Sequence, residues 1–165
     1  MKNIGILSDT HSCTDARFEQ HLGNCDEIWH AGDIGDASVL QYLKDICPVV
    51  RAVRGNVDHG PWLRECPPVQ DFYVEDVHVW MTHIGGYPGK YAPGVRPYLR
   101  NAKPDLMIAG HSHILKVMYD HDFHLLHINP GAAGYQGWQQ VRTLIRLTID
   151  GHDIKDLEVI ELGGN

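Results

Sequence analysis

The sequence contains no run of lysine or arginine, and no apolar run approaches the roughly 20 residues that a membrane-spanning helix needs. The formal net charge is −7, so a groove that grips a nucleic-acid backbone by charge is not expected. The first apolar run ends at Leu7, shortly before Asp9, and is too short for a signal peptide. We therefore expect a cytoplasmic protein that binds neither membranes nor nucleic acids stably.

Paired cysteines are also missing. The four cysteines, at positions 13, 25, 47 and 66, form no Cys-x-x-Cys motif. A chain of 165 residues buries enough apolar surface to fold without disulfides, so we expect reduced thiols. Structural zinc sites prefer closed Cys/His tetrahedra, which this spacing does not offer. Because linkers, low-complexity tracts and internal repeats are absent too, residues 1–165 are expected to form a single domain.

Histidine and aspartate are the residues in excess. The chain has 12 histidines against 14 lysines plus arginines, and 15 of its 21 acidic residues are aspartate. Both residue types favour turns, helix caps and metal shells over helix interiors. Hydrophobic residues make up 43% of the chain. The composition therefore indicates a polar site, built from loops, on an ordinary hydrophobic core.

Hydrophobic periodicity predicts an α/β protein whose first third reads βαβαβ. Strands are expected at 3–8, 27–30 and 48–53, with helices at 14–22, capped by Thr14 and stopped by Gly23, and at 37–46. The remainder is mostly antiparallel: hairpins of 70–75 with 77–82, 115–120 with 123–128 and 140–149 with 152–160, plus a helix at 95–102 and a strand at 105–109. These elements suit two packed mixed sheets with helices outside.

Five of the expected strands end in side chains that bind metals. These side chains are Asp9, His11, Asp33, Asn56, His83, His111 and His113. The carboxyl ends of strands border the crevice where α/β proteins bind ligands, so we expect all seven on one rim. Carboxylate, amide oxygen and imidazole suit Mn, Fe, Zn or Ni, and seven ligands suit two ions that share a carboxylate. Each motif alone is more often a turn or a surface histidine, and the inference depends on their conjunction.

The ordered motifs resemble those of the calcineurin-like metallophosphoesterases, and most of all the small YfcE/MJ0936-type phosphodiesterase branch. They are Asp9-Thr-His11, Gly32-Asp33, Gly55-Asn56-x-Asp58, His83, Gly110-His-Ser-His113 and Asn129-Pro-Gly131. The resemblance covers nearly the whole chain. It implies a four-layer α/β/β/α sandwich of two mixed β-sheets flanked by helices. It also implies a metal-dependent hydrolase of phosphoesters, with diesters more expected than monoesters.

The resemblance further implies residue roles. The first metal would be held by Asp9, His11 and His113, the second by Asn56, His83 and His111, and both by the bridging Asp33. A hydroxide between the two divalent ions would attack phosphorus, and Asn56 would also touch the substrate phosphate. Mn²⁺ is the expected ion, with Fe, Zn, Ni and Mg compatible. Two ions would change the net charge from −7 to −7 + 4 = −3, which favours a phosphate anion at the site.

Two positions depart from the family pattern. Val57 stands where many members have a histidine thought to protonate the leaving group. The available substitutes for this catalytic acid are Asp58 and His59, for which a capped turn is the alternative interpretation. Ala132 replaces the serine that usually follows Asn-Pro-Gly. Without a proton donor, aryl phosphates should be better substrates than alkyl phosphates.

Other polar residues have weaker signals. His30 suits a buried role behind the site, and His127 is close enough in sequence to Asn129 to approach it. Tyr87, Lys90 and Tyr91 follow His83 in a Gly/Pro-rich loop, where they either shape a substrate pocket or are simply solvated.

Two functional classes remain open. The expected partner is a small phosphoester substrate, and the family suggests a homodimer or a higher homo-oligomer. The alternative is a non-catalytic protein-binding scaffold, like the retromer subunit that shares this fold. A scaffold has no need to keep all seven ligand positions, whereas this sequence fills each of them with a competent residue.

Overall fold

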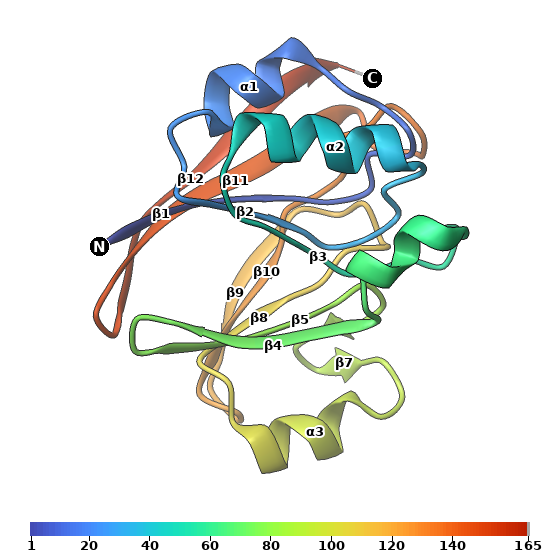
Figure 1. Ribbon diagram of the computed structural model, residues 1–165. Helices are drawn as coiled ribbons and strands as arrows, with labels where there is room; N and C mark the ends of the chain where they lie inside the picture. Colours follow the sequence, from blue (N-terminus) through green and yellow to red (C-terminus); the bar gives the residue numbers. More distant parts are fainter. Residues whose placement is uncertain (165) are drawn as a thin grey trace.

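Two five-stranded sheets lie face to face in the computed structural model, which describes residues 1–164. Helices α1 (Ala16–Leu22) and α2 (Ala37–Ile46) cover the outer face of one sheet, and α3 (Val95–Ala102) covers the other (Figure 1). This arrangement confirms the expected α/β/β/α sandwich of two mixed sheets. Within residues 1–164, no helix has the length and apolar character required to cross a membrane.

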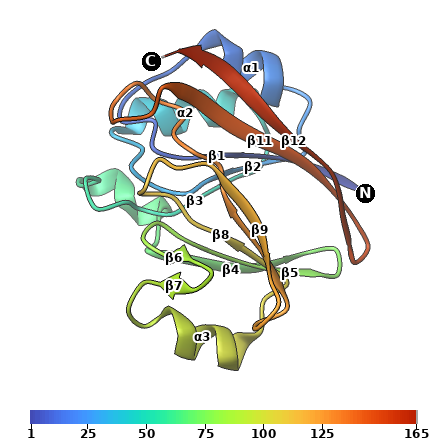
Figure 2. The same ribbon diagram turned by 180° about the vertical axis from the view of Figure 1, so that it is seen from behind.

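The first sheet has the strand order β12-β11-β1-β2-β3. Its members are β1 (Lys2–Leu7), β2 (Glu27–His30), β3 (Val50–Ala52), β11 (Val141–Asp150) and β12 (Asp153–Gly164). β1, β2 and β3 are parallel, and the long β11–β12 hairpin joins β1 antiparallel (Figure 2). The carboxyl ends of the three parallel strands therefore share one edge.

The second sheet has the order β4-β5-β8-β10-β9. Its members are β4 (Val69–Val74), β5 (Val77–Thr82), β8 (Leu106–Ile108), β9 (Lys116–Asp120) and β10 (Leu125–Asn129). β5, β8 and β10 are parallel, so their carboxyl ends also share an edge. The short hairpin of β6 (Gly86–Tyr87) and β7 (Lys90–Tyr91) follows β5.

An apolar core between the sheets fixes these two edges relative to each other. Ile4 and Ile6 of β1 face it from one sheet, and Val79 and Met81 of β5 from the other, all fully buried. Each such side chain stabilises the fold by about 1.5–3 kcal/mol relative to an exposed one. Because the core is closely packed, the loops at the strand ends are carried on a rigid base.

Several local details differ from the sequence expectation. The proposed N-cap Thr14 is wrong: the helix starts at Ala16, and the Asp15 carboxylate accepts the Arg17 N–H at 2.9 Å. Gly23 ends this helix as expected, donating its N–H to the Glu19 carbonyl. The 3₁₀ helix η1 (Pro61–Glu65) and the β6–β7 hairpin were not expected, because neither shows a repeating apolar pattern. All four cysteines are free thiols, as predicted.

Candidate metal centre

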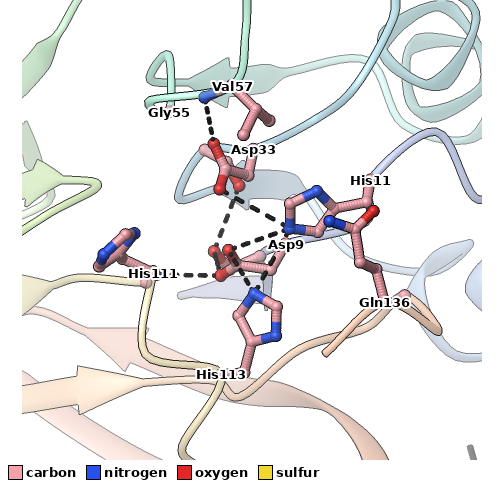
Figure 3. A network of polar contacts seen from close by, with 12 residues as sticks. Asp9, His11, Asp33, Gly55, Val57, His111, His113 and Gln136 are labelled. Carbon is pink, nitrogen blue, oxygen red and sulfur yellow. Dashed lines mark hydrogen bonds and ion pairs between the residues drawn. The ribbon is translucent and has the colours of Figure 1, made fainter. Parts of the chain in front are cut away.

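The seven predicted ligand side chains come together where the strand ends of the two sheets meet. The potential ligand atoms of Asp9, His11 and His113 lie within 4.8 Å of one another, as do those of Asp33, His83 and His111. Figure 3 shows His11 and His113 turned towards the carboxylates of Asp9 and Asp33. Residues more than 100 positions apart in the sequence thus form one cluster.

Asp9 is the buried centre of the first group. Its Oδ2 accepts hydrogen bonds from the Ser8 hydroxyl at 2.6 Å and from the His111 N–H at 3.1 Å. Its Oδ1 lies 3.2 Å from His113 Nε2 and 3.8 Å from His11 Nε2, but accepts no hydrogen bond from residues 1–164. Buried polar atoms nearly always have a partner. A carboxylate oxygen that lacks one and is surrounded by ring nitrogens fits a cation.

The imidazoles are oriented as metal ligands usually are. His83 donates its Nδ1–H to the Ala31 carbonyl at 2.7 Å, and His113 donates its Nδ1–H to Gln139 Oε1 at 3.0 Å. Both acceptors lack a proton, so each ring holds a proton on Nδ1, and Nε2 is the ring nitrogen that faces the centre. His11 Nε2 and His113 Nε2 lie 3.4 Å apart. The rings therefore have the orientation of metal ligands, with Nε2 towards the centre.

Asn56 belongs to the second group. Its Oδ1 lies 3.1 Å from His83 Nε2 and 3.0 Å from His111 Nδ1. The preceding Gly55 permits this placement, because a Cβ there would collide with the Asp33 carboxylate. Gly110, before His111, has the same role against Ser8 and Asp9. The glycines of the Gly-Asn and Gly-His motifs therefore let the loops approach the carboxylates closely.

Asp33 is a member of the second group that also faces the first. Its Oδ2 is 3.1 Å from His83 Nε2 on one side and 3.7 Å from His11 Nε2 on the other. Its Oδ1 accepts the Val57 N–H at 3.0 Å, which fixes the plane of the carboxylate. The Asp33 carboxylate thus faces a histidine of each group, as does Asp9, whose Oδ1 lies 3.2 Å from His113 Nε2 and 3.9 Å from His83 Nε2.

Both carboxylates are held in the ionised form. Burial opposes ionisation of Asp9, but His113, His83 and the Ser8 hydroxyl outweigh it and lower the pKa of Asp9 below its usual value. Burial is likewise outweighed at Asp33, whose pKa is lowered by His83 and by the Val57 N–H. Ionised carboxylates at neutral pH are the species that bind divalent cations.

The loops that carry these residues have an unusual backbone. Five candidate ligands have positive φ angles: Asp9 (54°), His11 (44°), Asp33 (55°), His111 (71°) and His113 (62°). Residues with a side chain rarely adopt this region, and each instance costs about 1–3 kcal/mol. Concentrated strain of this kind is typical of functional sites, because only the surrounding packing can maintain it.

Asp58 has a different environment from the one expected of a catalytic acid. Its carboxylate accepts three backbone N–H groups, from Gly55 at 2.8 Å, Gly35 at 2.9 Å and Ile34 at 3.2 Å. Both oxygens are therefore engaged in joining the loops that carry Asp33 and Asn56. His59 is exposed, and its Nδ1 lies 3.2 Å from the Val57 carbonyl.

His30 is fully buried behind the centre. Its Nδ1 accepts the Gly32 N–H at 3.1 Å, so its Nε2–H donates to the Thr10 hydroxyl at 3.0 Å. Burial lowers the pKa of His30 to about 4, so the ring is neutral. This histidine ties the β1 and β2 loops together, in line with the supporting role expected from the sequence.

Sequence reasoning missed some residues that support the ligands. Gln139 orients His113, but it lies in an irregular segment with no local signal. The sequence alone offers no physical role for the Asn-Pro-Gly motif, and the structure supplies one. Asn129 donates its Nδ2–H groups to the Gly110 carbonyl at 3.0 Å and the Ser112 hydroxyl at 3.1 Å, so it holds the Gly-His-Ser-His loop in place.

Comparison with known proteins agrees with this geometry. Residues 1–152 match the model of the calcineurin-like phosphoesterase superfamily domain. A probable metallophosphoesterase of Methanothermobacter thermautotrophicus is 30% identical, with 97% of this chain and 92% of the relative covered. A second, MJ0623 of Methanocaldococcus jannaschii, is 32% identical, with 78% and 67% covered.

Solved structures share the fold. Vps29 of Chaetomium thermophilum superposes with a TM-score of 0.76 at 16% identity, and all of both chains is covered. An archaeal phosphodiesterase gives a TM-score of 0.72 at 22% identity, with 97% of this chain and 99% of its own covered. The family model and the archaeal relatives go further than fold, and on their evidence this chain belongs to the calcineurin-like phosphoesterase superfamily.

Proposed function

We propose that this protein is a two-metal phosphoesterase that acts on phosphodiesters in preference to phosphomonoesters. The observation that carries the proposal is the position of Asp33, whose carboxylate faces one group of ligand atoms through His11 and another through His83. A two-metal centre needs such a shared carboxylate. A single structural ion does not.

The first ion would be held by Asp9, His11 and His113, the second by Asn56, His83 and His111, and both by Asp33. The mixture of carboxylate, amide and imidazole ligands, without thiolate, favours Mn²⁺, and Fe, Zn, Ni and Mg are also compatible. When bound, two such ions supply the Lewis acidity that produces a hydroxide at neutral pH and neutralises charge on the phosphoryl oxygens.

The chain's own residues orient the substrate. Asn56 directs its Oδ1 at His83 and His111, and we expect its Nδ2–H groups to donate to a phosphoryl oxygen. Positions 57–59, where the family pattern has its acid, offer no dedicated proton donor. Val57 carries no acid group, the Asp58 carboxylate is occupied by three N–H groups, and the exposed His59 faces the Val57 carbonyl. Leaving groups that need no proton, such as nitrophenolates, should therefore react fastest.

A protein-binding scaffold is the second candidate, because the fold is shared with Vps29. One such structure is Vps29 of Entamoeba histolytica complexed with Zn²⁺, with a TM-score of 0.75 and 16% identity. Metal binding alone therefore does not separate the two functions. The complete ligand set argues against the scaffold, and so do the strained positive φ angles of five of its residues.

Turnover separates the candidates. We expect the Mn²⁺-loaded protein to hydrolyse bis(p-nitrophenyl) phosphate faster than p-nitrophenyl phosphate, and EDTA to abolish both reactions. Faster hydrolysis of the monoester would refute the diester preference. A protein with two bound ions and no turnover on either compound would refute the enzyme and favour the scaffold.

A further inference from the structure

A pocket of about 400 Å³ opens beside the candidate metal centre. It lies between the loop that follows β5, including the β6–β7 hairpin, the loop that follows β8, and the adjoining ends of β9 and β10. His111, a candidate ligand of the second ion, forms part of its wall. Its volume is within the range of small-molecule sites, so a group attached to phosphorus at the centre can extend into it.

Flat, rigid side chains form much of the wall. The rings of Tyr87, Tyr91 and His127 line the pocket together with Ile84 and Ile114. Tyr91 is fixed by a hydrogen bond from its hydroxyl to Asp120 Oδ2 at 2.6 Å, and its ring centroid is 5.9 Å from that of Phe123. Ring-lined surfaces favour other aromatic groups, which stack or pack edge to face on them.

His127 supports the wall of the pocket as a buried, neutral ring. The residue is fully buried and donates its Nε2–H to the Gly86 carbonyl at 3.1 Å. Its Nδ1 has no partner within residues 1–164. Burial lowers the pKa of His127 to about 4, so this nitrogen is an unprotonated acceptor at pH 7. The neutral ring therefore adds no charge to the pocket wall.

The charge of the pocket also suits a phosphoester. Its lining includes two lysines, Lys90 and Lys116, and neither aspartate nor glutamate. The Lys116 ammonium lies 4.2 Å from the centre of the Tyr87 ring, which holds it at the wall by a cation–π contact. An anionic molecule with an apolar ring therefore meets positive charge and apolar surface together.

We propose that this pocket binds an aromatic group of the substrate, so that the protein selects aryl or heteroaryl phosphoesters over small alkyl ones. The inference rests on the proposed function, because it deepens that function by naming the substrate class. Ile84 and Ile114 are the side chains best suited to test it. They are 48% and 63% exposed, so their truncation leaves the core intact.

The test compares phenylphosphonate with methylphosphonate, two non-hydrolysable probes that differ only in the organic group. Dissociation constants are measured by ligand-observed NMR titration on the Mg²⁺-loaded protein, the double variant Ile84→Ala/Ile114→Ala, and the control Val159→Ala. Val159 is 39% exposed on β12, outside the pocket lining. The wild type should prefer phenylphosphonate by roughly tenfold, from the extra apolar area and ring packing.

The double variant should reduce this preference to about threefold or less, with methylphosphonate binding unchanged, because only apolar pocket wall is lost. The control should match the wild type. The inference would be overturned if the wild type bound the two probes with nearly equal dissociation constants, or if the double variant kept the full preference for phenylphosphonate. Absence of turnover would refute the proposed function alone, because the binding comparison needs no hydrolysis.

Discussion

Replacing Asp58 should loosen the two loops that carry Asp33 and Asn56. Its carboxylate accepts N–H groups from Ile34, Gly35 and Gly55, and the residue is only 9% exposed. A hydrogen bond to a charged group contributes about 1.5–3 kcal/mol. Three bonds at the lower value give a loss of roughly 4.5 kcal/mol in the free energy of unfolding for Asp58→Ala. Asp58→Asn keeps one oxygen and turns an NH₂ group towards a backbone N–H, so about 2 kcal/mol is expected.

Urea unfolding in EDTA gives these free energies without a contribution from metal. Initial rates on aryl diesters whose phenolate leaving groups differ in basicity then separate positioning from proton donation. A positioning residue affects every substrate by the same factor, because it displaces the ligands whatever the leaving group. The reasoning would be refuted if Asp58→Asn unfolded like the wild type and lost activity only on basic leaving groups, which is the signature of a general acid.

Two further predictions concern pH and metal removal. Burial lowers the pKa values of His30 and His127 to about 4. The unfolded chain therefore binds more protons than the folded one between pH 6.5 and 4. The free energy of unfolding should fall as the pH falls through this window, by up to about 3 kcal/mol for each histidine. Urea unfolding at pH 7, 5 and 4 should show this fall, and the variant His127→Phe should show about half of it. If the free energy of unfolding of the variant depended on pH as steeply as that of the wild type, the buried neutral ring of His127 would be contradicted. Removal of metal by EDTA should lower the melting temperature by about 5–10 °C relative to protein in Mn²⁺ at 100 times the dissociation constant. For the variant Asp9→Asn, scanning calorimetry should show a much smaller shift in melting temperature on removal of metal. A shift as large as that of the wild type would contradict a role for Asp9 as a ligand.

Much of the fold was predictable because apolar periodicity is strong in its main elements. The helices 37–46 and 95–102 have the predicted bounds, and the first parallel strands and the hairpins lie within a few residues of theirs. The N-cap of the first helix was missed by one residue, since both Thr14 and Asp15 can cap a helix and only the backbone geometry decides between them. The β6–β7 hairpin lies in a Gly/Pro-rich loop, where periodicity gives no signal.

The rim of the candidate site was predictable because ligand-type residues follow strand ends, and parallel strands bring those ends together. The supporting contacts were not. Gln139 reaches His113 across 26 positions, and Asp58 accepts the N–H groups of Ile34 and Gly35 from 24 and 23 positions away. Such contacts depend on how the loops pack in three dimensions. The sequence therefore left Asp58 open between a proton donor and a capped turn, and the fold engages its carboxylate with backbone N–H groups.

The claim that two ions share Asp33 is tested most directly by counting metal in the Asp33→Asn variant. Wild type and variant are loaded with Mn²⁺, passed through a desalting column, and analysed by plasma mass spectrometry alongside their turnover of bis(p-nitrophenyl) phosphate. The wild type should retain two ions per chain. The variant should retain at most one and lose activity by at least about 10²-fold, because the charge stabilisation of the second ion is gone. Two ions in the variant, with unchanged turnover, would contradict the shared carboxylate and the two-metal account built on it.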